Sequence, residues 1–150
     1  MSVVRSFIPV IQAAAYADGQ ALGTSAKELT DVFKDTGRVS YLKNVIVRDK
    51  AKQNAALTLY FFSQAPATST ITDKVDVDIS DADLQFFIGR AIVTDTDYEN
   101  FANNSVAQVE VTVQMQGGGY KSVWVVPVCR DTPTWVSTSD LTISASFIQE

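Results

Sequence analysis

The sequence predicts an all-β domain: an antiparallel β-sandwich of about eight strands with one or two short helical turns. Two observations carry this prediction. Val, Ile, Leu, Tyr and Phe fill Val39–Val47 and Ala55–Phe62, and these residue types suit a pleated, half-buried surface. Apolar residues also alternate with polar ones from Ala107 to Met115, as in a strand with one buried face. Strands at this spacing favour a sandwich of jelly-roll type.

The amino-terminal part of the chain contains the first elements in order. Val3–Ile11 alternates weakly, which fits either a first strand or an arm lying on a partner. Ala13–Lys27 is rich in small residues and predicts strand ends and turns. Glu28–Phe33 predicts a short strand closed by a turn at Asp35–Gly37. Between the two strands named above lies Arg48–Asn54, a charged and amide-rich connection that we expect to stay in solvent.

The middle of the chain mixes strands with capped turns. Val75–Ile79 alternates with aspartates and predicts a strand with one wet face. Ser80 has the character of an N-cap, so a short helix is expected over Asp81–Phe87. Ile88–Thr94 predicts the next strand. A second cap pattern precedes Asn100–Asn104 and predicts a second helical turn there.

The last third has the clearest β pattern. Gly117–Gly119 supplies a permissive backbone and predicts a hairpin turn after the alternating strand. Tyr120–Val128 is its expected partner, apolar enough to be covered on both faces. Asp131–Thr134 predicts a turn. Leu141–Phe147 alternates again and predicts the final strand.

Composition limits the chemistry that is available. The chain has 150 residues, of which 46% are hydrophobic, which suits a single domain spanning residues 1–150. There is no histidine, which excludes Ser-His-Asp and Cys-His catalysis and histidine-ligated zinc. The single cysteine, Cys129, lies in an apolar strand and is expected to be a buried, inert thiol.

Charge is unevenly distributed along the chain. The net charge is −5, which argues against sequence-independent nucleic-acid binding. Arg38–Lys52 contains five bases and one acid, whereas Asp73–Glu99 contains eight acids and two bases. Such asymmetry can steer copies of the chain together or onto a partner. The alternative is that both segments are ordinary solvated surface.

Export and membrane insertion are not predicted. Met1–Ala17 loosely imitates a signal peptide, but Pro9 and Gln12 weaken its apolar core. No run approaches the roughly 18 apolar residues that a membrane span needs. We therefore expect a protein made and used without export.

No catalytic, cofactor or metal site is predicted. An EF-hand starting at Asp76 would need glycine and glutamate where the chain has Asp81 and Phe87. Asp95, Asp97 and Glu99 could form a glycosidase carboxylate pair with Asp76 or Asp78, but exposed acids around a short helix cap are the preferred interpretation. We expect Trp124 to be core. Trp135 follows a proline in a loop, and with Tyr98 it would form an aromatic platform for a glycan if both rings were exposed.

Several segments together resemble a known family of small virion proteins of tailed bacteriophages. The segments that carry the resemblance are Lys43–Phe62, Ser80–Leu84, Ile88–Gly89, Asn103–Val106 and Asp131–Thr142. This resemblance is associated with jelly-roll capsid cement, or decoration, proteins. The resemblance extends from Arg38 to Gln149 and is weaker over the first 37 residues.

The resemblance implies a structural role without chemistry. Such a protein is made in the host cytoplasm and sits on the capsid exterior of the virion. There it contacts the major capsid protein and bridges capsomers, as a dimer or trimer on the symmetric lattice. The alternatives are a receptor- or glycan-binding module and a tail or neck component. The expected contact residues are Val3, Arg5, Phe7 and Ile8 of an arm within residues 1–12, the basic Arg48, Lys50 and Lys52, and the aromatic Tyr98 and Trp135.

Overall fold

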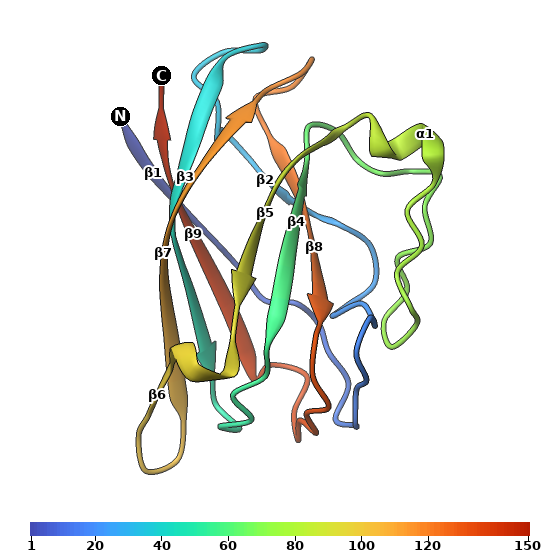
Figure 1. Ribbon diagram of the computed structural model, residues 1–150, viewed down its shortest axis with the longest axis vertical. Coiled ribbons are helices and arrows are strands. Elements are labelled where there is room, and N and C mark those ends of the chain that lie inside the picture. The colour runs from blue at the N-terminus through green and yellow to red at the C-terminus, as the bar shows by residue number, and fades with distance from the viewer.

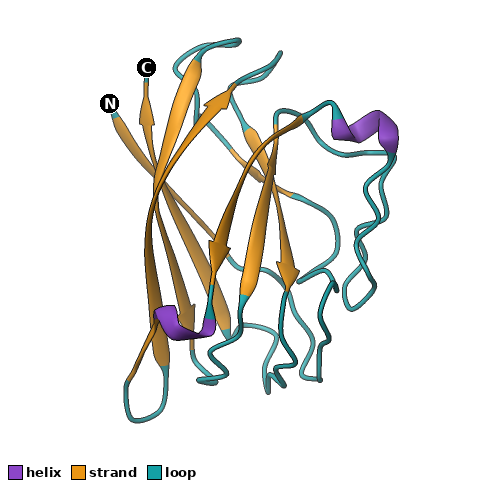
Figure 2. Cartoon of the chain, in the orientation of Figure 1, coloured by secondary structure: helices purple, strands orange, loops and turns teal.

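The computed structural model describes all 150 residues as two antiparallel sheets packed face to face (Figures 1 and 2). The five-stranded sheet has the order β1-β9-β3-β7-β6, and the four-stranded sheet has the order β2-β8-β4-β5. The strands are β1 (Ser2–Phe7), β2 (Lys27–Leu29), β3 (Val39–Asp49), β4 (Leu57–Phe62), β5 (Phe87–Val93), β6 (Tyr98–Asn100), β7 (Ser105–Gln116), β8 (Val123–Cys129) and β9 (Leu141–Gln149). The predicted antiparallel sandwich is confirmed, with nine strands.

The core lies between the sheets and is built from the inward half of each alternating strand. Twenty-six buried residues form one cluster. Phe61 of β4 and Phe147 of β9 meet across it edge to face, with ring centroids 6.4 Å apart. Cys129 is fully buried, as expected, and burial raises the pKa of its thiol. Removal of this apolar area from water is the main force that holds the two layers together.

Two connections that look local in sequence cross between the layers. The hairpin predicted at Gly117–Gly119 is wrong, because β7 belongs to the five-stranded sheet and β8 to the four-stranded one. Gly117 allows the crossing: a Cβ there would lie 3.0 Å from the Arg38 carbonyl oxygen and 3.1 Å from the Phe33 ring. The connection from β3 to β4 likewise changes sheet. Each crossing turns the apolar faces of successive strands toward each other.

Two predicted strands differ from the structure. Val75–Ile79 forms only isolated bridges, between Gln20 and Asp76 and between Thr70 and Asp78. Its alternation arises because Val77 and Ile79 pack on the outer face of the four-stranded sheet. In the predicted strand Glu28–Phe33, only the first two residues belong to β2.

The helical turns are shorter than predicted. Helix α1 spans Asp81–Leu84, and the Ser80 hydroxyl accepts a bond from the Asp83 amide, as expected. It does not reach Phe87, where β5 begins. The second turn is a 3₁₀ turn, η1, over Asp95–Asp97. It lies before the predicted position because Thr94 supplies its cap. No helix in the structure has the length and apolar character needed to cross a membrane.

The outer faces of the two sheets differ. The segment between β4 and β5 folds back over the four-stranded sheet, where Ile71, Val77 and Ile79 pack against buried Phe62 and Val128. Figure 1 shows this segment, with α1 at its upper end, to the right of the four-stranded sheet. On the five-stranded sheet, the outward side chains of β1 and β7 remain exposed, among them Ser2, Val4, Ser6, Gln108, Glu110, Thr112, Gln114 and Gln116. One face is therefore covered by the chain itself and the other is open.

The two chain ends meet at one end of the sandwich (Figure 1). The Gln149 amide donates to the Met1 carbonyl at 2.9 Å, and Met1 N donates to the Gln149 carbonyl at 3.5 Å. Strand β3 begins beside this end, where Ser40 pairs with Gln149, and finishes at the far end, where Asp49 pairs with Leu141.

Replacing Gly89 by alanine should destabilise the sandwich by about 1–3 kcal/mol, the usual cost of overpacking. Gly89 lies on β5, and a Cβ there would be 2.7 Å from Val113 Cγ1 on the facing sheet. Urea unfolding measures the effect. Gly119→Ala is the control, because nothing lies within 4 Å of its added Cβ. Equal stability of the two variants would contradict the expected clash.

Candidate functional site

The two aromatic residues predicted as contact residues are buried. Trp135 is 1% exposed and Tyr98 is 9% exposed. The Trp135 indole packs edge to face on Tyr16, with ring centroids 5.3 Å apart. The Tyr98 hydroxyl donates to the Ala55 carbonyl at 2.9 Å. The prediction that these rings form a contact surface is wrong, because the loop carrying Trp135 folds inward and contributes the indole to the core.

The predicted amino-terminal arm is a strand of this chain's own sheet. Residues 2–7 pair with β9, and Ile11 is fully buried, so the arm interpretation is wrong. Val3 and Phe7 face inward and pack on the core. Arg5 donates from Nε to the Thr30 carbonyl at 2.6 Å. Of the four predicted arm residues only Ile8 is exposed. A contact role for Ile8 stays a prediction.

The outer edge of β1 is unpaired. Met1 exchanges hydrogen bonds with Gln149 across the β1–β9 pair. Hydrogen-bonded and non-hydrogen-bonded pairs alternate in an antiparallel ladder, so Ser2, Val4 and Ser6 direct their backbone groups away from β9. The Val4 carbonyl already accepts a bond from Arg5 Nη1 at 3.0 Å. The outward N–H groups are available to an added strand.

The basic connection after β3 is folded around one carboxylate. Asp49 is 1% exposed, so the expectation that this whole connection stays in solvent is wrong at that residue. Its oxygens accept bonds from the amides of Ala51 at 2.9 Å, Gln53 at 2.8 Å and Asn54 at 3.2 Å. Burial raises the pKa of Asp49, and these bonds oppose the rise. The carboxylate holds the loop that carries Lys50 in one conformation.

A cavity of about 310 Å³ lies where β3 ends and β7 begins. Its lining residues are Arg48, Asp49, Lys50, Phe101, Asn104, Ser105 and Val106. The structure thus places two of the three predicted basic contact residues, Arg48 and Lys50, in one cavity. Lys52 is exposed on the same loop but does not line the cavity.

The basic side chains of this cavity have no acidic partner in the protein, and one of its lining residues has a polar atom without a hydrogen-bond partner. Arg48 Nη1 donates to the Ser144 hydroxyl at 2.9 Å. The only ion pairs in the structure are Lys121–Asp35 and Arg130–Asp18, so neither cation of the cavity has an acidic partner. Ser105 is 3% exposed and its hydroxyl lacks a hydrogen-bond partner. Phe101 is 55% exposed beside these polar groups.

Sequence reasoning missed Asn104 as a site residue and did not place Phe101 beside Arg48 and Lys50. It assigned Asn100–Asn104 to a helical turn, whereas Asn100 ends β6 and residues 101–104 connect β6 to β7. The Phe101 amide donates to the Asn104 carbonyl at 2.8 Å, which closes a tight reversal. The exposed aromatic beside Asn103-Asn-Ser105 was the available signal, because asparagine and serine favour turns.

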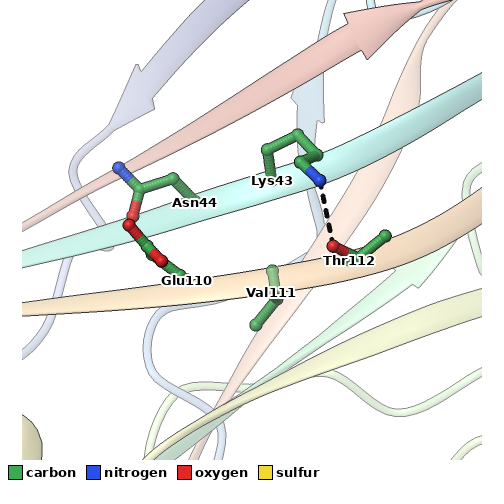
Figure 3. A pocket seen from close by; sticks show the side chains of 5 residues that line it. All are labelled: Lys43, Asn44, Glu110, Val111 and Thr112. Atoms are coloured by element: carbon green, nitrogen blue, oxygen red, sulfur yellow. Dashed lines mark hydrogen bonds between the residues drawn. The ribbon is translucent and has the colours of Figure 1, made fainter.

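A second hollow, of about 500 Å³, lies on the open face of the five-stranded sheet (Figure 3). It forms where the register of β3 shifts between Leu42 and Asn44. Lys43 Nζ donates to Thr112 Oγ1 at 3.0 Å, as the dashed line in Figure 3 marks. Lys43 and Glu110 supply one charge of each sign, so this hollow has no preference for an ion of either charge.

Some carboxylates of the acidic segment Asp73–Glu99 accept hydrogen bonds within the chain. The Asp83 carboxylate accepts bonds from the Ser69 hydroxyl at 2.6 Å and the Thr68 hydroxyl at 3.0 Å, and such bonds lower its pKa. Asp97 closes a capping box with Thr94. No group of three potential metal-ligating His, Cys, Asp or Glu residues gathers in the structure.

Comparison with known proteins identifies no family: no protein-family model matches the sequence, and no curated protein matches it. The fold and the surface define the molecule broadly as a two-sheet β-sandwich. It presents one open sheet face, an unpaired edge at β1, and a loop-lined end whose cavity contains Arg48 and Lys50.

Proposed function

We propose that this protein is a structural component of a phage particle that binds the outside of an icosahedral capsid and stabilises it by contact. The observation that carries the proposal is the unequal covering of the sandwich. The four-stranded sheet is covered by the chain's own segment, whereas the five-stranded sheet keeps an open face and an unpaired edge at β1. A rigid scaffold with one open side suits a protein that acts by burying surface on a partner.

The strand order supports the jelly-roll interpretation on which the resemblance depends. Across the two sheets, β1 lies beside β9, β2 beside β8, β3 beside β7 and β4 beside β5. This nested order is the one that two successive Greek keys produce, and jelly rolls of this kind occur in viral capsid and lectin domains.

The proposed partner is the major capsid protein. An unpaired strand edge offers main-chain hydrogen bonds to an extended segment of a neighbour. The basic end around Arg48 and Lys50 adds complementary charge, which contributes more to association rate and orientation than to affinity. Many copies on a symmetric lattice also favour a closed dimer or trimer of this chain.

Co-sedimentation tests the proposal. Capsids that lack this protein are prepared from the phage that encodes it. Purified protein is added to them, and the mixture is separated on a density gradient. We expect it to band with the capsids at a fixed ratio to the major capsid protein. Recovery with isolated tails, or absence from both fractions, would overturn the assignment to the capsid exterior.

Val4→Pro should weaken capsid binding by about tenfold or more if the β1 edge is used, because a lost main-chain hydrogen bond and a misfitted strand together cost more than about 1.4 kcal/mol. The Val4 N–H points away from β9, so the substitution leaves the β1–β9 ladder intact. Proline is tolerated on edge strands for this reason.

Val4→Ala is the matched control for that measurement, because it removes the exposed side chain and keeps the N–H. Full capsid affinity of a folded Val4→Pro protein would show that the edge is not used. Deletion of residues 1–12 is a poorer test, because it also removes Val3, Phe7 and Ile11 from the core.

A further inference from the structure

We propose that the cavity between the end of β3 and the start of β7 is a binding site for a carboxylate side chain of a partner protein, presented beside an apolar residue. The inference deepens the proposed function. It rests on that function in one respect, which is that the partner is a protein. It assigns binding roles to Phe101 and Asn104 as well as to Arg48 and Lys50.

The first support is unmatched positive charge on a rigid base. Arg48 lies on β3 within the five-stranded sheet. One of its five N–H donors is used by Ser144, whose hydroxyl is in turn 2.7 Å from that of Ser6. A guanidinium fixed in this way keeps donors for a carboxylate, which it can bind in a bidentate manner. Lys50 follows two residues later on the loop that Asp49 holds.

The acids near the cavity do not neutralise these cations. Both oxygens of Asp49 already accept bonds from backbone amides. Glu99 stands across β7 from Arg48, since both are register partners of Val106. It is exposed and forms no ion pair with Arg48. Arg48 and Lys50 therefore remain open to an incoming anion.

The neutral part of the lining selects among anions. The Ser105 hydroxyl takes no part, because it is buried and, as the register partner of buried Asp49, lies on the opposite face of the sheet from Arg48. Phe101 exposes an aromatic ring at the rim, which favours a ligand with an apolar neighbour over bare phosphate. The net charge of −5 opposes the approach of a nucleic acid, whose affinity comes mainly from phosphate neutralisation.

Nuclear magnetic resonance titration of the full chain tests the site. The probe is N-acetyl-leucyl-glutamate N-methylamide, and the matched control ligand has glutamine in place of glutamate. We expect saturable shifts of the Lys50, Asn104 and Ser105 amide signals with the glutamate peptide. The apparent affinity should fall about tenfold or more with the glutamine peptide, and it should weaken when salt is raised from about 50 to about 500 mM.

Substitutions locate the effect. Arg48→Gln and Lys50→Gln should each weaken binding of the glutamate peptide about fivefold to tenfold. Phe101→Ala should weaken it while leaving the salt dependence unchanged, because the ring contributes apolar contact. Lys34→Gln makes the same charge change on an exposed loop before β3 and should leave binding unchanged. Chemical-shift dispersion verifies that each variant is folded.

Three outcomes would overturn the site: no saturable shift, equal affinity for the glutamate and glutamine peptides, or equal affinity for inorganic phosphate at the same residues. The capsid experiment separates this inference from the proposed function. Capsid binding without peptide binding overturns the carboxylate site alone. Peptide binding without capsid binding overturns the capsid role and leaves a carboxylate site whose partner lies elsewhere.

Discussion

Replacing Trp135 by alanine should lower the free energy of unfolding by about 3–5 kcal/mol, as expected for a large aromatic side chain lost from a core. The indole is 1% exposed and packs edge to face on Tyr16. Its loop is held separately, because the Asp140 carboxylate accepts bonds from the Val136 and Ser137 amides at 2.9 Å each. The loop cannot easily collapse into the space left by the ring, so a cavity should remain.

Urea unfolding followed by circular dichroism measures this loss. Val136→Ala is the control, since the neighbouring side chain is 75% exposed, and such surface changes usually stay within about 0.5 kcal/mol. A loss below about 1 kcal/mol for Trp135→Ala would mean that the ring does not pack as described.

Replacing Asp49 by alanine should cost about 3 kcal/mol or more, because three backbone amides lose their acceptor at once. Those amides belong to Ala51, Gln53 and Asn54. Hydrogen exchange should also accelerate at the same three amides, which separates loss of this anchor from general destabilisation. Asp95→Ala, at an exposed acid, is the control and should leave these exchange rates unchanged.

The effect of Asp49 should depend on pH in a defined direction. Burial raises its pKa in the folded protein, so the folded state binds the proton more tightly than the unfolded chain does. The stability that this linkage supplies is fully present below the unfolded pKa of about 3.9 and is lost as pH rises through the raised folded pKa. The stability difference between wild type and Asp49→Ala should therefore be larger below that window than above it. A difference that grows with pH would contradict this sign.

Local pattern predicted individual strands well but not their distribution between layers. The alternation in β7 and β9 identified their buried faces because a half-buried strand has a period of two. The same alternation at Val75–Ile79 came from packing on the outside of a sheet. Gly117–Gly119 fits a hairpin by local chemistry, yet local chemistry does not specify which sheet the next strand joins.

The candidate site was predicted in part for a similar reason. Charge identified Arg48 and Lys50, since an excess of bases is visible in the sequence. The position of Phe101 beside them depends on the pairing of β6 with β7, which links residues that no periodic pattern connects. Trp135 was misplaced because loops usually lie at the surface, whereas this loop contributes a large ring to the core.

Because the two chain ends lie side by side, the molecule is suitable for terminal labelling and for circular permutation. A reporter fused before Met1 or after Glu150 leaves from the end of the sandwich opposite the cavity that contains Arg48 and Lys50, so that cavity stays uncovered. A short linker from the last residue to the first would give circular permutants. Each permutant would have its new ends at a different exposed turn. Whether it folds would show whether the connection cut at that turn is required for folding.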